Sequence, residues 1–347
     1  MTRGRSLPPP SGTRSGRDGA VADETGGHVP VLVEAVVGAL SPRDDALYVD
    51  GTFGAGGYSR ALLAAAKCRV VAIDRDPDAV RRGRALARSV CGRLAVIEGN
   101  FGDMEQLLAP VVPAPIAGIA LDLGVSSMQL DQAERGFSFR LDGPLDMRMS
   151  GAGQSAEDLV ATLAEDDLAR LIREFGEERF ARRIARAIAA ERQRQPIRRT
   201  FELAQIVRAA VPRAEPGLDP ATRTFQALRI ALNDELGELE RGLGAAERLL
   251  MPGGRLAIVS FHSLEDRQVK DFLRQRSDTA PRVSRHAPVP AVVAMPSFEL
   301  LHRRAVKPSP EEIARNPRAR AARLRAAERT TAPPWPPGRD RRQRPVA

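Results

Sequence analysis

The chain has 347 residues, of which 43% are hydrophobic and 28% charged, the composition of a soluble globular protein. No apolar run approaches the roughly 20 residues of a membrane span. The two cysteines lack metal-type spacing, and the four histidines form no cluster. We therefore expect a reduced, cytoplasmic protein of two or more domains, with no metal site and no membrane partner.

The net charge of +9 lies mainly near the carboxyl terminus. Residues 315–347 contain ten arginines against Glu328 and Asp340. Residues 1–27 are rich in Arg, Ser, Pro and Gly and lack the apolar centre of a signal peptide. We predict a disordered leader over 1–27 and a basic disordered tail over 311–347. The part between them is close to neutral.

Short apolar strands alternate with helical segments in the first third of the chain, the pattern of a parallel α/β sheet. Asp50, Asp74 and Asp122 stand at the predicted carboxyl ends of three strands. Ligands bind at this edge of open α/β sheets, so we expect these carboxylates to converge there, with Phe101. The predicted strands cover 47–50, 69–73, 93–98, 116–121 and, later in the chain, 256–260.

A glycine-rich turn at 51–57 follows the first strand, and its spacing indicates the kind of cofactor. The glycines are spaced G-x-x-G-x-G-G rather than the G-x-G-x-x-G of dinucleotide sites. Asp50 before the turn would repel a pyrophosphate, whereas Asp74 lies about where a ribose-binding acid is expected. The combination resembles class I methyltransferases, whose cofactor S-adenosylmethionine carries a ribose, an adenine and a sulfonium but no phosphate.

Between about residues 155 and 240 the apolar residues recur at helical spacing. We expect an all-helical insertion domain at 136–239, inside a Rossmann-like methyltransferase domain formed by 28–135 and 240–310. Its predicted helices cover 156–163, 166–175, 177–194, 200–210 and 220–239. Seven arginines against Glu191 lie within residues 181–199.

An ordered series of motifs resembles the ribosomal RNA small subunit methyltransferase H family, also called MraW. The resemblance covers about residues 28–307, and the ordered series is far more specific than any single block. The motifs are DGTFGAGG from Asp50, AIDRDP from Ala72, LDLGVSS from Leu121, QLD from Gln129, AERGFSF from Ala133, GPLDMRM from Gly143, RTFQALRI from Arg223, NDEL from Asn233 and SFHSLEDR from Ser260.

The resemblance implies N4-methylation of a cytidine in the decoding region of small-subunit ribosomal RNA, with S-adenosylmethionine as cofactor. It places Tyr58 where the family usually has His and Met128 where it usually has Pro, so a side-chain role for Tyr58 is in doubt. Asp122 is the candidate catalytic acceptor for the target amine, and a purely cofactor-binding role stays open beside it. The implied cofactor-binding residues are Gly56, Gly57, Tyr58, Asp74, Phe101, Asp122 and Gln129.

Arginines suit phosphate contacts, so Arg182, Arg183 and Arg186 are candidate RNA-binding residues. The expected partner is small-subunit ribosomal RNA within an assembled or nearly assembled subunit, and a homodimer is possible. His262 fits either a proton shuttle or a hydrogen bond at a helix start. A DNA amino-methyltransferase, a non-catalytic RNA-binding module and a nicotinamide oxidoreductase are the rival classes. The first usually has an Asp/Asn-Pro-Pro-aromatic motif where this chain has Asp122-Leu-Gly-Val.

Overall fold

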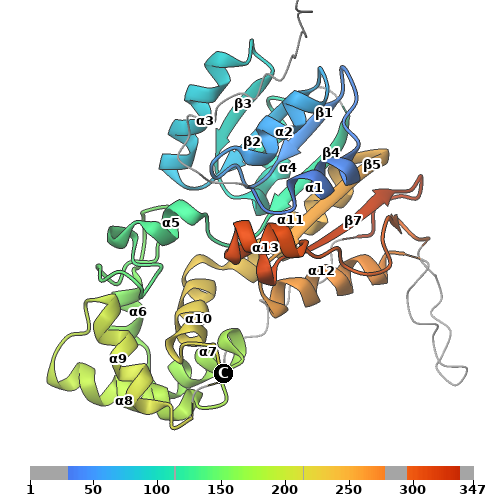
Figure 1. Cartoon of the computed structure of the whole chain (residues 1–347). Coiled ribbons are helices and arrows are strands. Elements are labelled where there is room, and N and C mark those ends of the chain that lie inside the picture. The colour runs from blue at the N-terminus through green and yellow to red at the C-terminus, as the bar shows by residue number, and fades with distance from the viewer. Residues whose placement is uncertain (1–29, 113–114, 214, 278–294, 337–347) are drawn as a thin grey trace, which may run out of the picture.

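The computed structural model describes residues 30–112, 115–213, 215–277 and 295–336. Within these ranges a seven-stranded sheet has the order β3-β2-β1-β4-β5-β7-β6 (Figure 1). The strands from β3 to β5 are parallel, and β7 is antiparallel to both of its neighbours. The strands are β1 (Leu47–Asp50), β2 (Arg69–Asp74), β3 (Leu94–Glu98), β4 (Ile116–Asp122), β5 (Leu250–Ser260), β6 (Phe298–Leu300) and β7 (Arg323–Arg329).

Helices cover both faces of the sheet, which explains why its central strands are almost continuously apolar. Every residue of β1 is buried, and β4 is buried at all positions before Asp122. One face carries α1 (Val33–Leu40), α2 (Gly57–Ala65) and α3 (Pro77–Ser89), and the other carries α4 (Met104–Leu108), α11 (Glu235–Leu249) and α12 (Ser263–Gln275). The expected α/β architecture is therefore confirmed.

The chain leaves the sheet after β4 and forms a separate helical body, drawn in green to yellow in Figure 1. The short helix α5 (Ser127–Asp131) and a 3-10 turn at 133–135 lead into it. Its own apolar core contains buried side chains from Phe137 to Leu228. The helices are α6 (Ala156–Thr162), α7 (Glu165–Gly176), α8 (Ala181–Arg194), α9 (Thr200–Ala210) and α10 (Ala221–Asn233).

The single helix predicted over 220–239 is wrong, because the structure breaks it at Asp234. Asp234 adopts a left-handed conformation (φ 50°) that ends α10 and precedes α11. Leu239 and Leu243 of α11 then pack in the core beneath the sheet. The helical insert therefore ends near residue 234, not 239. The sequence did not reveal the break because the amphipathic spacing continues through it, although α10 packs in the core of the insert and α11 packs against the sheet.

The predicted disordered tail over 311–347 is also wrong over its described part. This part contains α13 (Pro310–Arg315), a 3-10 helix over 317–321 and β7, the strand between β5 and β6. Leu324 and Ala326 are buried, while Arg325 pairs with Asp266 at 2.7 Å. Because the segment is rich in arginine, its alternation of buried apolar and charged residues was not recognised as a strand from the sequence.

Even the proline-rich segment after β7 is attached to the sheet domain. The Trp335 amide donates to Glu247 Oε1 at 3.0 Å, and its indole N–H donates to the Met295 carbonyl at 2.9 Å. The predicted leader over 1–27 and residues 337–347 of the predicted tail lie outside the described residues. Among the helices that are described, none is long and apolar enough to cross a membrane.

We expect Leu324→Ala to lower the free energy of unfolding by about 2–5 kcal/mol, because it removes a fully buried side chain from an inner strand. Arg320→Ala, at an exposed site four residues earlier, is the matched control and should change it by less than about 0.5 kcal/mol. Urea unfolding followed by the fluorescence of Trp335, the single tryptophan, measures both. Equal small effects would contradict a structural role for β7.

Candidate active site

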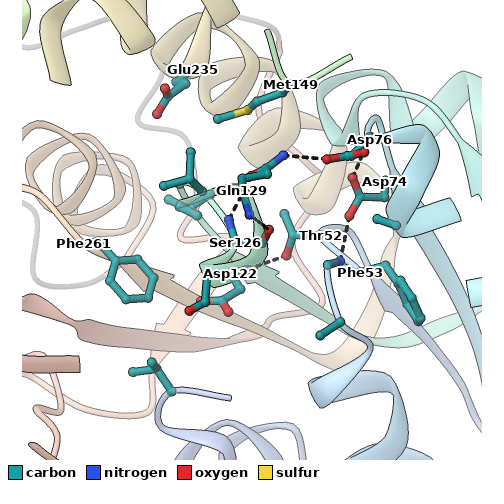
Figure 2. Close-up of a pocket in the computed structure, with 18 of the residues that line it drawn as sticks. Thr52, Phe53, Asp74, Asp76, Asp122, Ser126, Gln129, Met149, Glu235 and Phe261 are labelled. Carbon is teal, nitrogen blue, oxygen red and sulfur yellow. Dashed lines mark hydrogen bonds between the residues drawn. The ribbon is translucent and has the colours of Figure 1, made fainter. Parts of the chain in front are cut away.

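A cavity of about 490 Å³ opens at the carboxyl ends of β1, β2 and β4 (Figure 2). One side is formed by the glycine turn and the strand ends, and the other by residues of the helical insert such as Met149 and Thr222. A third part of the wall consists of Asn316 and, from the 3-10 helix over 317–321, Arg318 and Ala321. Of the residues predicted to converge here, Asp74, Phe101 and Asp122 line the cavity and Asp50 does not. The segment that we predicted to be disordered forms an additional wall.

The glycine turn is held rigidly against the sheet. Gly56 has φ +81° and is the N-cap residue of α2, at the end of the turn. A Cβ at Gly56 would lie 2.6 Å from the Phe53 ring, so both the backbone angle and the space require glycine. Gly54 donates its N–H to Asp74 Oδ2 at 2.7 Å, and Gly56 donates to the Phe53 carbonyl at 2.6 Å.

Asp50 lies beneath this turn rather than in the cavity wall. It is 1% exposed, and its carboxylate accepts hydrogen bonds from the Ser59 hydroxyl at 2.7 Å and the Ser59 N–H at 3.1 Å. Burial raises the pKa of Asp50 to about 6, against the effect of these donors. Asp50 therefore fixes the start of α2 to the end of β1, and the cavity is lined by its neighbours.

Asp74 lines the cavity at the end of β2, and each of its oxygens already accepts one backbone N–H. Oδ2 accepts from Gly54, and Oδ1 accepts from Asp76 at 2.8 Å. Burial raises the pKa of Asp74, while these two N–H groups favour its charged form. Each oxygen retains a lone pair, so the carboxylate is oriented and still able to accept hydrogen bonds from a ligand.

Gln129 is held by its neighbours instead of pointing freely into the cavity. Its Nε2 donates to Asp76 Oδ2 at 2.8 Å, and its Oε1 accepts from the Ser126 N–H at 2.9 Å. Arg135 donates to the same Asp76 oxygen at 2.9 Å (Figure 2 shows the Gln129–Asp76 bond). Gln129 therefore lines the cavity as part of a buried polar network that joins β2 to the insert.

Asp122, at the end of β4, has the least satisfied carboxylate of the site. Its backbone N–H donates to Thr52 Oγ1 at 2.6 Å, which fixes the strand end beside the glycine turn. The Oδ1 atom is buried and has no hydrogen-bond partner within the described residues. Burial, together with the Asp50 and Glu265 carboxylates, raises the pKa of Asp122 well above its usual range. Such an atom is available to a donor entering the cavity.

The remaining predicted cofactor residues divide into wall residues and supports. Gly57, Tyr58 and Phe101 line the cavity, whereas Gly56 does not. The Tyr58 hydroxyl donates to the Val31 carbonyl at 2.7 Å, so its side chain anchors the segment before α1. Phe101 packs against α11, where a Cβ at Gly242 would come within 2.5 Å of its ring.

The far end of the cavity contains residues that sequence reasoning did not assign to the site. Phe261 and Glu265 come from the start of α12. Arg229 and Glu235 also line the cavity and form a bidentate ion pair at 2.7 and 2.8 Å. All four lie in motifs that carried the family resemblance, but their convergence depends on the fold. His262 is the N-cap residue of α12, where its Nδ1 accepts the Glu265 N–H at 3.3 Å. This is the hydrogen bond at a helix start that was one of the two predicted roles.

Glu235, His262 and Glu265 form a group that spacing along the sequence did not predict. One ligand-type atom of each lies within 4.8 Å of the others. Arg229 neutralises Glu235, and Glu265 Oε2 accepts the N–H groups of Phe261 and His262 at 2.8 and 3.3 Å. These contacts explain the group as the capped start of a helix beside an ion pair. The expected absence of a metal stays a prediction.

The candidate RNA-binding arginines lie on α8, away from the sheet edge (Figure 1). Arg182, Arg183 and Arg186 are exposed, and Arg186 faces Glu165 at 3.7 Å. Three further arginines of this basic run also have acidic partners, namely Arg194 with Glu191, Arg198 with Glu157 and Arg199 with Asp142. The local excess of positive charge is therefore smaller than the sequence indicates.

Comparisons with known proteins agree with this architecture. The family model described as the MraW methylase family matches residues 25–330. Two relatives named ribosomal RNA small subunit methyltransferase H come from Paramagnetospirillum magneticum and Rhodospirillum centenum. The first is 60% identical and the second 62%, and the matches cover 89% and 88% of this chain and 97% and 93% of the relatives.

Among solved structures, an rRNA methylase from Streptococcus thermophilus is similar with a TM-score of 0.35 and 13% identity, covering 86% of this chain and 93% of the other. The sheet order, the antiparallel β7 and the cavity at the carboxyl edge of the strands define the class I methyltransferase fold. Within that class, the match to the family model and the identity to the relatives are decisive. The chain belongs to the MraW methylase family.

We expect Gly56→Ala to destabilise the protein more than Gly92→Ala. Both glycines have positive φ (+81° and +73°), so a Cβ costs roughly 1–2 kcal/mol at either position. At Gly56 the Cβ also meets the Phe53 ring, whereas nothing lies within 4 Å at Gly92. Thermal unfolding of the two variants isolates the clash, and equal losses would show that the turn can move away from Phe53.

Proposed function

We propose that this protein transfers a methyl group from S-adenosylmethionine to N4 of a cytidine in the decoding region of small-subunit ribosomal RNA. The names of the relatives support the RNA substrate. The observation that carries the chemistry is the buried Asp122 Oδ1, which lies in the cavity wall and has no hydrogen-bond partner among the residues that the structure describes. We infer a cytoplasmic enzyme that acts on an assembled or nearly assembled small subunit; a homodimer stays a prediction.

The site fits a cofactor that has a ribose and no phosphate. Two N–H groups of the turn that could contact a pyrophosphate are already bonded, because Gly54 donates to Asp74 and Gly56 to Phe53. The carboxylates of Asp74 and Asp76, which line the cavity after β2, also disfavour a phosphate there. Asp74 would accept the ribose hydroxyls, and the glycine turn at 51–57 would support the rest of the ligand by close backbone approach.

Asp122 is the proposed acceptor for the target amine. A cytosine amino group is a weak nucleophile because its lone pair is delocalised into the ring, and S-adenosylmethionine supplies a methyl group on a sulfonium, a good leaving group. The protein therefore has to hold the amine in line and to stabilise the positive charge that develops on it. A carboxylate with a free buried oxygen and a raised pKa can accept the amine N–H and then its proton.

Phe261 supplies an aromatic surface for the target base. Its ring lies in the cavity on the same side as Asp122 (Figure 2). Proteins commonly recognise an unstacked RNA base by packing it on an aromatic side chain while polar groups contact its edge. The Phe261 N–H is held by Glu265 Oε2 at 2.8 Å, which fixes the start of α12 behind the ring.

The rival classes fit this site less well. A nicotinamide oxidoreductase needs a pyrophosphate site, and two backbone donors of the glycine turn are already bonded within the protein. A non-catalytic RNA-binding module does not need an oriented Asp74, or an Asp122 oxygen that lacks a partner in the described part of the chain. We also propose that Arg182, Arg183 and Arg186 contact phosphates of the RNA, since all three are exposed on one helix.

Transfer of tritium from labelled S-adenosylmethionine tests the function as a whole. The acceptors are undermodified small subunits, protein-free ribosomal RNA and DNA, followed by nucleoside analysis of the product. We expect N4-methylcytidine in the small-subunit RNA. Label on another nucleoside, or a preference for DNA, would overturn the proposed reaction.

Two variants separate cofactor binding from chemistry. Asp74→Ala should weaken S-adenosylmethionine binding by about 1.5–3 kcal/mol, the scale of hydrogen bonds to a charged group.

Asp122→Asn should slow single-turnover transfer by roughly 10²–10⁴-fold and weaken cofactor binding far less. Calorimetry and rapid-quench measurements on both proteins give the comparison. If Asp122→Asn loses as much binding as transfer, Asp122 is only a cofactor ligand.

A further inference from the structure

A second concave surface lies between α12 and β7 in the sheet domain. This groove of about 570 Å³ is lined by twelve residues, of which seven are Lys or Arg, one is His and none is acidic. Its basic side chains come from α12, from the connection between β6 and α13, and from β7. Apart from Arg325, the Lys and Arg residues of the groove are Lys270, Arg274, Arg303, Arg304, Lys307 and Arg323.

Within the described residues, most of the positive charge of the groove has no acidic partner. Arg325 is bound to Asp266, but the other six Lys and Arg side chains have no ion pair or hydrogen bond within the described part of the chain. The acidic residues nearest in sequence, Asp271 and Glu299, do not line the groove. On the helical insert, by contrast, four of the seven arginines between 181 and 199 face an acidic partner.

The groove begins close to the cavity. Arg323 is the first residue of β7 and pairs in register with Ser260, directly before Phe261 of the cavity wall. Ala321, two residues before Arg323, lines the cavity itself. On α12, Glu265 lines the cavity and Lys270 lines the groove, about 7.5 Å further along the helix axis at 1.5 Å per residue.

We propose that this α12–β7 groove binds the phosphodiester backbone of the ribosomal RNA strand that flanks the target nucleotide. The inference rests on the proposed function, which places that nucleotide in the adjoining cavity. The groove lining contains no Phe, Tyr or Trp, and its Lys and Arg side chains suit phosphate contacts. None of the exposed large apolar residues (Val111, Leu141, Phe201 and Met295) lines it, which argues against a membrane surface.

The test removes three exposed positive charges from the connection before α13, with the substitutions Arg303→Gln, Arg304→Gln and Lys307→Gln. These residues lie outside the regular elements and outside the cavity wall, so the fold and cofactor binding should be retained. The control Arg60→Gln, Arg84→Gln and Arg88→Gln removes the same charge from α2 and α3. Those helices cover the opposite end of the sheet.

We expect the groove variant to bind protein-free small-subunit RNA with a salt slope reduced by about 2–3, at roughly 0.7–0.9 for each of the three lost phosphate contacts. Its KM for small subunits should rise, with kcat and S-adenosylmethionine affinity unchanged, and the control should match wild type. An unchanged slope and KM would overturn the proposal. So would a loss of binding to assembled subunits alone, because the partner would then be an acidic ribosomal protein.

Wild-type methyl transfer separates this inference from the proposed function. If wild type methylates the RNA and the groove variant is indistinguishable from it, only the groove assignment fails. If wild type does not methylate ribosomal RNA, the proposed function fails whatever the groove binds.

Discussion

The buried carboxylate of Asp76 joins the two parts of the molecule, and the shape of the cavity depends on it. Asp76 is 4% exposed and accepts from Gln129 and Arg135 on one oxygen and from the Asp78 N–H at the start of α3 on the other. Arg135 also donates to the carbonyls of Arg148 and Met149 in the insert. Because a buried charge without its partner costs several kcal/mol, the sheet and the insert are held in one arrangement.

Three aspartates at the ends of neighbouring strands show how position decides the role of one residue type. Asp50 is enclosed and bonded to Ser59, so it supports the glycine turn. Asp74 is partly open and oriented by two N–H groups, which suits a ligand with hydroxyls. Asp122 has one buried oxygen without a partner among the described residues, which is the basis of its proposed role as acceptor. Their shared position at strand ends is visible in the sequence, whereas this division of roles depends on the atoms around each carboxylate.

Sequence reasoning succeeded where local chemistry and fold agree, as in the strand-end acids and the glycine turn. It failed at Asp234, because the amphipathic pattern of α10 continues into α11 while the apolar surface that they face changes. It also failed at β7, where the arginines at 323, 325 and 329 made the buried Leu324 and Ala326 hard to recognise as a strand. The cavity residues Phe261, Arg229 and Glu235 were present in recognised motifs, but only tertiary contacts bring them to one wall.

The position of β7 has a consequence for the order in which the protein is completed on the translating ribosome. Domains fold as their residues emerge, and the helical core needs the chain only as far as Leu228. The edge of β5 has no partner until Arg323–Arg329 has been synthesised. A nascent chain therefore carries a finished helical body beside an open strand edge, a surface prone to wrong pairing. The cavity is complete only when Ala321 has joined its wall, so newly made enzyme becomes competent late in its own synthesis.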